Sequence, residues 1–256
     1  MHSSARIATL LWISLTGIGC QSGSFPDPND PNIAGSLSGE QMQLVVRGIY
    51  ENLAYRVRTG EITEARLRKE LVSRTREFSR DINLENLDPG EAFAYGEVLR
   101  TAEEWDRAEI AFAITMNAAK TPDQRVNAAL RLAHCQAKLG KAKDAIALAR
   151  STFDAPPGDK GAILPAVLLE IAPALERAKV DKELATLLVD SVTQHLQVSV
   201  DPATPPGKAF LVARPFHVRN AMDMSIRLYR RAGDFAAAER AAKRRRNVLA
   251  SLAMQR

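Results

Sequence analysis

Aromatic residues are scarce in this sequence of 256 residues, at 5% of positions, whereas alanine is abundant. β-Strands favour β-branched and aromatic side chains, and alanine is the strongest helix former. The composition therefore argues against a β-sheet protein and predicts an all-α fold. Hydrophobic residues make up 46% of the chain, which is enough to build a buried core and excludes global disorder.

Cysteine occurs only twice, at Cys20 and Cys135. A pair so far apart, with one member near the N-terminus, excludes the disulfide framework of a small secreted domain. Cys135 lies in the helix-like stretch RLAHCQAKL beside His134. Neighbours in sequence do not face each other on a helix, so we expect Cys135 to be a core residue and not a catalytic nucleophile.

Motifs that carry catalysis or bind metals are also missing. The sequence has no glycine-rich phosphate loop, no His-Glu-x-x-His, no Gly-x-Ser-x-Gly and no Cys-x-x-Cys. None of its histidines has a second ligand at metal-binding spacing on the same helix face. We therefore predict that the protein is not an enzyme and holds no metal ion or cofactor. The histidines are His2, His134, His195 and His217.

The first 19 residues are predicted to be a signal peptide. Arg6 precedes an apolar run of 12 residues, IATLLWISLTGI, and small residues follow. That run is too short to span a bilayer as a helix, which takes about 20 residues. This order of charge, apolar run and small residues is the layout of a secretory signal. The alternative is a buried N-terminal helix, although the run shows no amphipathic period.

The segment Gly17-Ile18-Gly19-Cys20 resembles the lipobox of bacterial lipoproteins, with glycine where leucine is usual. The resemblance implies that Cys20 carries palmitate and anchors the chain to a membrane. It also implies a place in the bacterial cell envelope, and Gln21 favours the outer membrane facing the periplasm. Residues 20–38, rich in Gly, Ser, Pro and Asp, predict a flexible tether. The alternative is a soluble secreted protein.

Residues 39–88 predict an N-terminal helical hairpin. Apolar residues recur at three- and four-residue steps from Met42 to Val57, which marks one face of a first helix. Thr63 is a suitable N-cap for a second helix. The stretch LDPGEA breaks the chain near residue 88.

Residues 89–256 contain three stretches with a common pattern. In each, a predicted helix ends in a short polar turn, and an alanine lies three positions after the first residue beyond that turn. This pattern resembles the tetratricopeptide repeat, and it implies helix–turn–helix units stacked as a short right-handed solenoid. A fourth unit over 161–196 fits by pattern, with Pro165 and Pro173 disturbing its first helix. We expect the proline-rich residues 199–216 to form a surface loop. A generic helical bundle is the alternative. The alanines are Ala108, Ala145 and Ala238, and Ala185 takes this place in the fourth unit.

The repeat resemblance implies that the first helix of each unit lines a concave groove for a peptide. Residues 202–256 also hold 12 Lys and Arg against 3 Asp and Glu. Their last helix is either a solvated face or a basic surface for an anionic partner. The expected groove residues are Asn127, His134, Asn220, Arg227 and Arg230. The expected basic patch is Arg240, Lys243, Arg244, Arg245 and Arg246.

These features together predict a membrane-tethered scaffold that binds protein or peptide partners in the cell envelope. Nucleic acid is not expected as a partner, because no aromatic residues alternate with the basic ones to stack on bases. Two alternatives remain at this point. One is an envelope hydrolase that acts on cell-wall polymer within a helical superhelix, and the other is a purely structural oligomer.

Overall fold

The computed structural model describes residues 37–254, and these fold into helices with no β-strand among them. The predicted all-α class is therefore confirmed for this part of the chain. The predicted signal peptide, Cys20 and all of the tether except residues 37 and 38 lie outside the described residues. None of the helices between residues 37 and 254 combines the length and apolar character needed to cross a membrane.

The N-terminal hairpin consists of α1 (Gly39–Arg58) and α2 (Glu64–Ser79). Ser38 forms a capping box with Gln41 at the start of α1. Thr63 caps α2 as predicted, since its side chain accepts a hydrogen bond from the backbone N–H of Arg66 at 3.3 Å. The predicted apolar face of α1 is confirmed as well. Its buried members are Met42, Val46, Ile49 and Leu53.

Two further helical hairpins follow a loop that occupies the predicted break near residue 88. Ala108 and Ala145 lie where their paired helices cross, and neither has any exposed surface. A β-carbon added at Gly96 would lie only 2.8 Å from a ring carbon of Phe112, so glycine permits the close approach of the first pair. The first hairpin is α3 (Ala92–Thr101) with α4 (Trp105–Ala118), and the second is α5 (Pro122–Lys138) with α6 (Ala142–Ser151).

The fourth predicted unit begins with an irregular helix, as its prolines suggested. Pro173 has no N–H to donate to the carbonyl four residues earlier, and the chain makes a wider π-helical turn just before it. Ala185 is fully buried in the second helix of the unit. The segments are α7 (Ile163–Ala166), the π-helix η4 (Val167–Ile171), α8 (Ala172–Leu175) and α9 (Asp181–Leu196), after the 3₁₀ turns η2 (Thr152–Asp154) and η3 (Pro157–Ala162).

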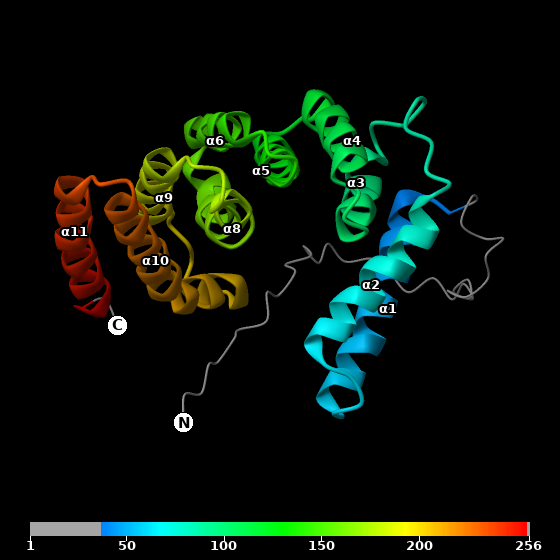
Figure 1. Ribbon diagram of the computed structural model, residues 1–256, viewed down its shortest axis with the longest axis horizontal. Coiled ribbons are helices and arrows are strands. Elements are labelled where there is room, and N and C mark those ends of the chain that lie inside the picture. Colours follow the sequence, from blue (N-terminus) through cyan, green and yellow to red (C-terminus); the bar gives the residue numbers. More distant parts are fainter. Residues whose placement is uncertain (1–36, 255–256) are drawn as a thin grey trace.

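The expected surface loop over 199–216 is wrong for most of its length. Helix α10 (Pro205–Arg231) already begins at residue 205, and it pairs with α11 (Phe235–Met254). The prolines at 205 and 206 suit a helix start, where backbone N–H groups need no intrahelical partner, and Thr204 supplies the cap. Pro215 lies inside α10, and Figure 1 shows that this helix bends along its length.

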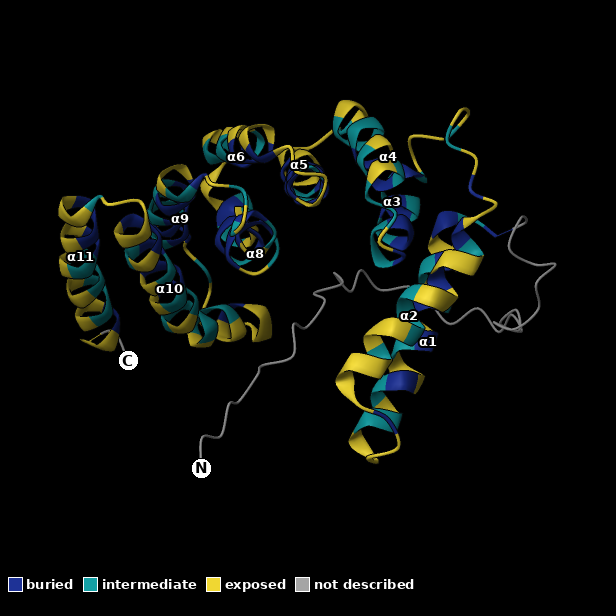
Figure 2. Cartoon of the chain, viewed as in Figure 1, coloured by how far each residue is buried: buried dark blue, intermediate teal, exposed yellow. Residues whose placement is uncertain are grey.

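The helices form an arch in which most pack mainly on their neighbours in sequence, while α1 packs on α3 as well as on α2 (Figure 1). Helices α3, α5, α8 and α10 lie along the inner side of the arch, and α4, α6, α9 and α11 lie outside them. Buried residues follow the contacts between helices from one end to the other, as Figure 2 shows. The apolar core is therefore extended along the array and has no single centre.

Candidate functional site

A hollow of about 360 Å³ opens between the π-helical turn η4 and α10. It brings together Asn220 and Arg227, two of the predicted groove residues, with Asp223 between them in sequence. On the opposite wall, Leu169 keeps 41% of its surface exposed. The lining residues are Leu168, Leu169, Asn220, Asp223, Met224 and Arg227.

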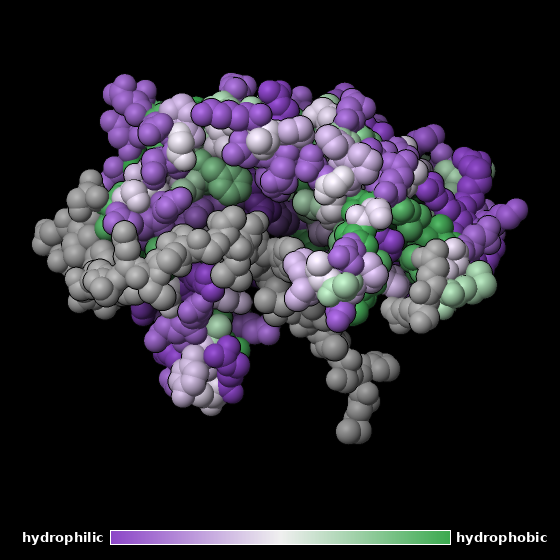
Figure 3. All heavy atoms as spheres, turned by 180° about the vertical axis from the view of Figure 1, so that it is seen from behind, coloured by the Kyte–Doolittle hydropathy of each residue, from purple (hydrophilic) through white to green (hydrophobic). Residues whose placement is uncertain are grey.

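The same face of α10 continues as an apolar surface beyond the hollow. Val212 is 74% exposed and Phe216 is 39% exposed. They precede Asn220 at four-residue steps, which places the three side chains along one side of the helix. Figure 3 shows apolar surface gathered over the part of the arch that holds α8 and α10. We call Leu169, Val212, Phe216 and Asn220 the α10 strip.

Ion pairs hold the charged residues at the edge of the hollow. Arg227 Nη2 lies 2.5 Å from Glu176 Oε1, and Arg245 Nε of α11 lies 2.6 Å from Asp223 Oδ1. Asn220, in contrast, makes no side-chain hydrogen bond with another described residue. Its amide can donate and accept at once, so it is the polar group of the strip that remains available to a ligand.

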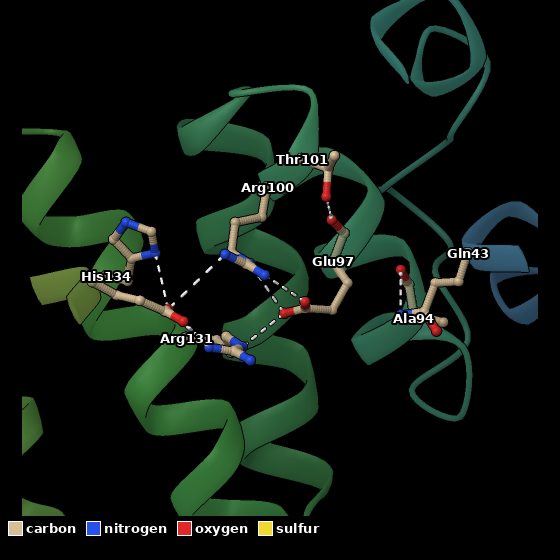
Figure 4. Close-up of polar contacts among 8 residues, drawn as sticks. Gln43, Ala94, Glu97, Arg100, Thr101, Arg131 and His134 are labelled. Carbon is tan, nitrogen blue, oxygen red and sulfur yellow. Dashed lines mark hydrogen bonds and ion pairs between the residues drawn. The ribbon is translucent and has the colours of Figure 1, made fainter. Parts of the chain in front are cut away.

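A network of partly buried charges joins three helical segments on the inner side of the arch (Figure 4). Arg131 of α5 lies at its centre, with Nε 2.9 Å from Glu97 Oε1 and Nη1 2.8 Å from Glu170 Oε1. Arg100 of α3 completes the network, with Nη2 2.7 Å from Glu97 Oε2. His134 Nδ1 lies 3.3 Å from Glu170 Oε2, outside good hydrogen-bond geometry.

The electrostatics of this network keep both carboxylates ionised. Burial alone would raise the pKa of Glu170, but the contacts with His134 and the charges of Arg131 and Arg100 lower it well below its usual range. Burial alone would also raise the pKa of Glu97, but its arginine partners lower it. Burial also lowers the pKa of His134. A carboxyl group that acts as a general acid near neutral pH needs a raised pKa. The lowered values therefore favour a structural role, in which the network holds the three helical segments together.

The structure separates the other predicted groove residues from this site. His134 is buried in the charge network, with 6% of its surface exposed. Asn127 donates a hydrogen bond to Asp123 in the first turn of its own helix, at 3.1 Å. Arg230 is exposed on α10 but does not line the hollow. Sequence reasoning missed Val212 and Phe216, although their four-residue spacing inside the supposed loop was a helical signal.

The five basic residues predicted as a patch divide among different surroundings on α11. Arg244 Nη2 donates to Thr193 Oγ1 of α9 at 2.6 Å, and Arg245 pairs with Asp223 of α10. Arg240, Lys243 and Arg246 remain exposed. Consecutive helical residues point about 100° apart, so a run of four basic residues cannot share one face. Arg240, Lys243 and Arg246, which follow one another at three-residue steps, are thus the part of the predicted patch that stays exposed along one side of α11.

Cys135 is a buried free thiol, as its sequence context predicted. Burial raises its pKa to about 12, so the reactive thiolate form is scarce at neutral pH. Within residues 37–254 no three side chains of the His, Cys, Asp or Glu type gather in a way that could hold a metal ion. The residues of the α10 strip thus remain the best candidates for a binding site.

Comparisons with known proteins assign no family to this chain. No family model matches its sequence, and no match was found among curated proteins or solved structures. The function proposed below therefore depends on the geometry of the site and on the sequence motifs.

Proposed function

We propose that the protein is a helical-repeat scaffold that binds protein partners through the α10 strip. The observation that carries this proposal is the exposure of Leu169, Val212 and Phe216 beside a free amide, on α10 and the neighbouring η4 turn. Exposed apolar groups in a row gain free energy when a partner covers them. Their grouping around Asn220 is typical of a surface made for recognition.

The chemistry of the strip favours a peptide segment with apolar side chains. Apolar side chains of the peptide would pack on Val212 and Phe216, and the Asn220 amide would bond to a peptide group of the backbone. Arg227 and Asp223, which border the hollow, form ion pairs with Glu176 and Arg245 respectively. The tetratricopeptide resemblance supports this function, because stacked units of that kind present their first helices to a ligand.

A pair of phenylalanine variants tests this proposal. We expect Phe216→Ser to lose a partner that photo-crosslinks in cells to position 224, which lines the hollow but is not part of the strip. Phe235→Ser is the matched control, since Phe235 is also exposed, at 70%, but begins α11 on the outer layer. The control should keep the cross-link. Equal cross-linking by all three proteins, or none by the unchanged protein, would contradict the proposal.

We also propose that the scaffold is anchored in the bacterial envelope through a lipid on Cys20. The support is the lipobox-like segment before Cys20 and the tether composition after it. Labelled palmitate should enter the unchanged protein but not Cys20→Ala, with Cys135→Ala as the matched control that keeps the label. Absence of label from the unchanged protein would remove the membrane anchor and favour the secreted alternative.

A further inference from the structure

The first part of α10, residues 205–214, rests on the C-terminal end of α9. We call it the α10 arm. The Phe210 ring lies 4.7 Å from the ring of His195 on α9, measured between centroids. Arg214 Nη2 donates to the carbonyl oxygen of Val198 at 2.5 Å, and its guanidinium group lies 4.7 Å from the Phe210 ring centre. These contacts hold the arm at an angle to the rest of α10.

Two imidazoles without hydrogen-bond partners lie beneath the arm. His195 is only 1% exposed, and neither of its ring nitrogens has a partner among the described residues. The ring of His217, just past Pro215, lies 6.3 Å away, and its Nδ1 is also buried and unpartnered. Buried polar groups are normally satisfied, so two such rings in contact are unusual.

The groups that face these rings are neutral or positive. His195 and His217 face each other, and the guanidinium of Arg214 on α10 lies near His195. From η3, Lys160 approaches the end of α9, with Nζ 3.4 Å from Gln197 Oε1. No carboxylate within residues 37–254 makes an ion pair with any of these four groups. A proton added here would therefore place uncompensated positive charge in a buried site.

We propose that the α10 arm is a latch that acid opens, because protonation of His195 and His217 drives the arm away from α9. Opening carries Val212 away from Phe216 and so dismantles the α10 strip. The opening of the arm is inferred from the contacts described above, whereas the effect of opening on partner binding rests on the proposed function.

The direction of the pH response follows from the burial of the two rings. Burial lowers the pKa of His195 to about 3, and it lowers that of His217 as well. In the open arm each ring would regain its ordinary pKa of about 6.5. The closed latch is therefore fully stable above that pH and weakens as the pH falls below it. The titration of His195 alone should make the equilibrium constant for opening about 30-fold larger at about pH 5 than above the ordinary pKa.

Hydrogen exchange on the full chain tests the latch. After correction for intrinsic rates, the amides of residues 208–214 should exchange at least about 30-fold faster at about pH 5 than at about pH 7.5. Amides in α4 serve as the internal reference. The double variant His195→Leu/His217→Leu removes both titrating rings and should abolish the response. His134→Leu, which removes a buried histidine elsewhere, should keep it.

Two outcomes would overturn the latch. One is equal protection of the arm at both pH values, and the other is an undiminished response in the double variant. If that variant fails to fold, Phe210→Ala replaces it, because loss of the ring contact should open the arm at both pH values. Photo-crosslinking from position 224 separates the two proposals, since faster exchange with an unchanged cross-link supports the latch and contradicts docking on the strip.

Discussion

At the scale of single residues, the crossing of α3 and α4 depends on an absent side chain. Gly96 lies against the Phe112 ring, which is completely buried, and a β-carbon there would meet three ring carbons at 2.8 to 3.0 Å. Gly48 is also helical, but nothing lies within 4 Å of its added β-carbon. The two glycines therefore separate the effect of packing from that of helix propensity.

We predict opposite effects of alanine at these two positions. Alanine favours a helix over glycine by about 1 kcal/mol, so Gly48→Ala should raise the free energy of unfolding by about that amount. Gly96→Ala should lower it by about 1–3 kcal/mol, because the methyl group forces the Phe112 ring to move. Urea unfolding measures both. A gain of stability in both variants would show that the crossing of α3 and α4 accommodates a methyl group at position 96, and would contradict the prediction.

At the scale of elements, α2 begins where its cap dictates. The Thr63 side chain satisfies the N–H of Arg66, which would otherwise lack an intrahelical partner. We predict that Thr63→Ala lowers the free energy of unfolding by about 1 kcal/mol. Thr63→Ser keeps the capping oxygen and should cost far less. An equal loss in the two variants, measured by urea unfolding, would assign the effect to the methyl group and not to the cap.

Element boundaries could be predicted well where local chemistry sets them. The cap at Thr63 and the small residues at Ala108 and Ala145 are short-range signals, and the structure confirms them. The start of α10 could not be recognised, because its proline pair favours a loop and a first helical turn alike. The four-residue spacing of the exposed Val212 and Phe216 is the one signal that favours a helix over a loop here.

The site was harder to predict than the fold, since its contacts join distant positions. Asn220 and Arg227 share a helix, and their common face could be inferred from spacing. The opposite wall, at Leu169, lies in a π-helical turn of another unit, whose register no periodic pattern gives. His134 looked like a groove residue by position, but Glu170, which lies beside it, is 36 residues further along the chain.

At the scale of the whole molecule, the charge network links α3, α5 and η4, so it should govern how stability depends on pH. The pKa of Glu170 is lowered despite burial, by His134 and two arginines, so its ionised form favours the folded state. That contribution is complete above its ordinary pKa of 4.5 and is lost as the pH falls below this value. The network therefore weakens in acid.

We predict that Glu170→Gln lowers the free energy of unfolding by about 3 kcal/mol at neutral pH, because it leaves buried arginine charge uncompensated. The difference from the unchanged protein should shrink as the pH drops below 4.5. Glu51→Gln is the control, since its pair with Arg47 is exposed and should be worth less than about 1 kcal/mol. Urea unfolding across this pH range measures both, and a difference that stays constant with pH would contradict the assignment.

The arrangement of neighbours along the arch has a mechanical consequence. Helices α1 and α11 lie at opposite ends of the array, and most helices are held mainly by those next to them in sequence. A pull between the two ends would pass through every hairpin in series, as through a row of springs. The stretches of the hairpins add, while the weakest junction sets the load that the whole row can bear. In a molecule built this way, a junction can open without its distant neighbours, beginning with the weakest.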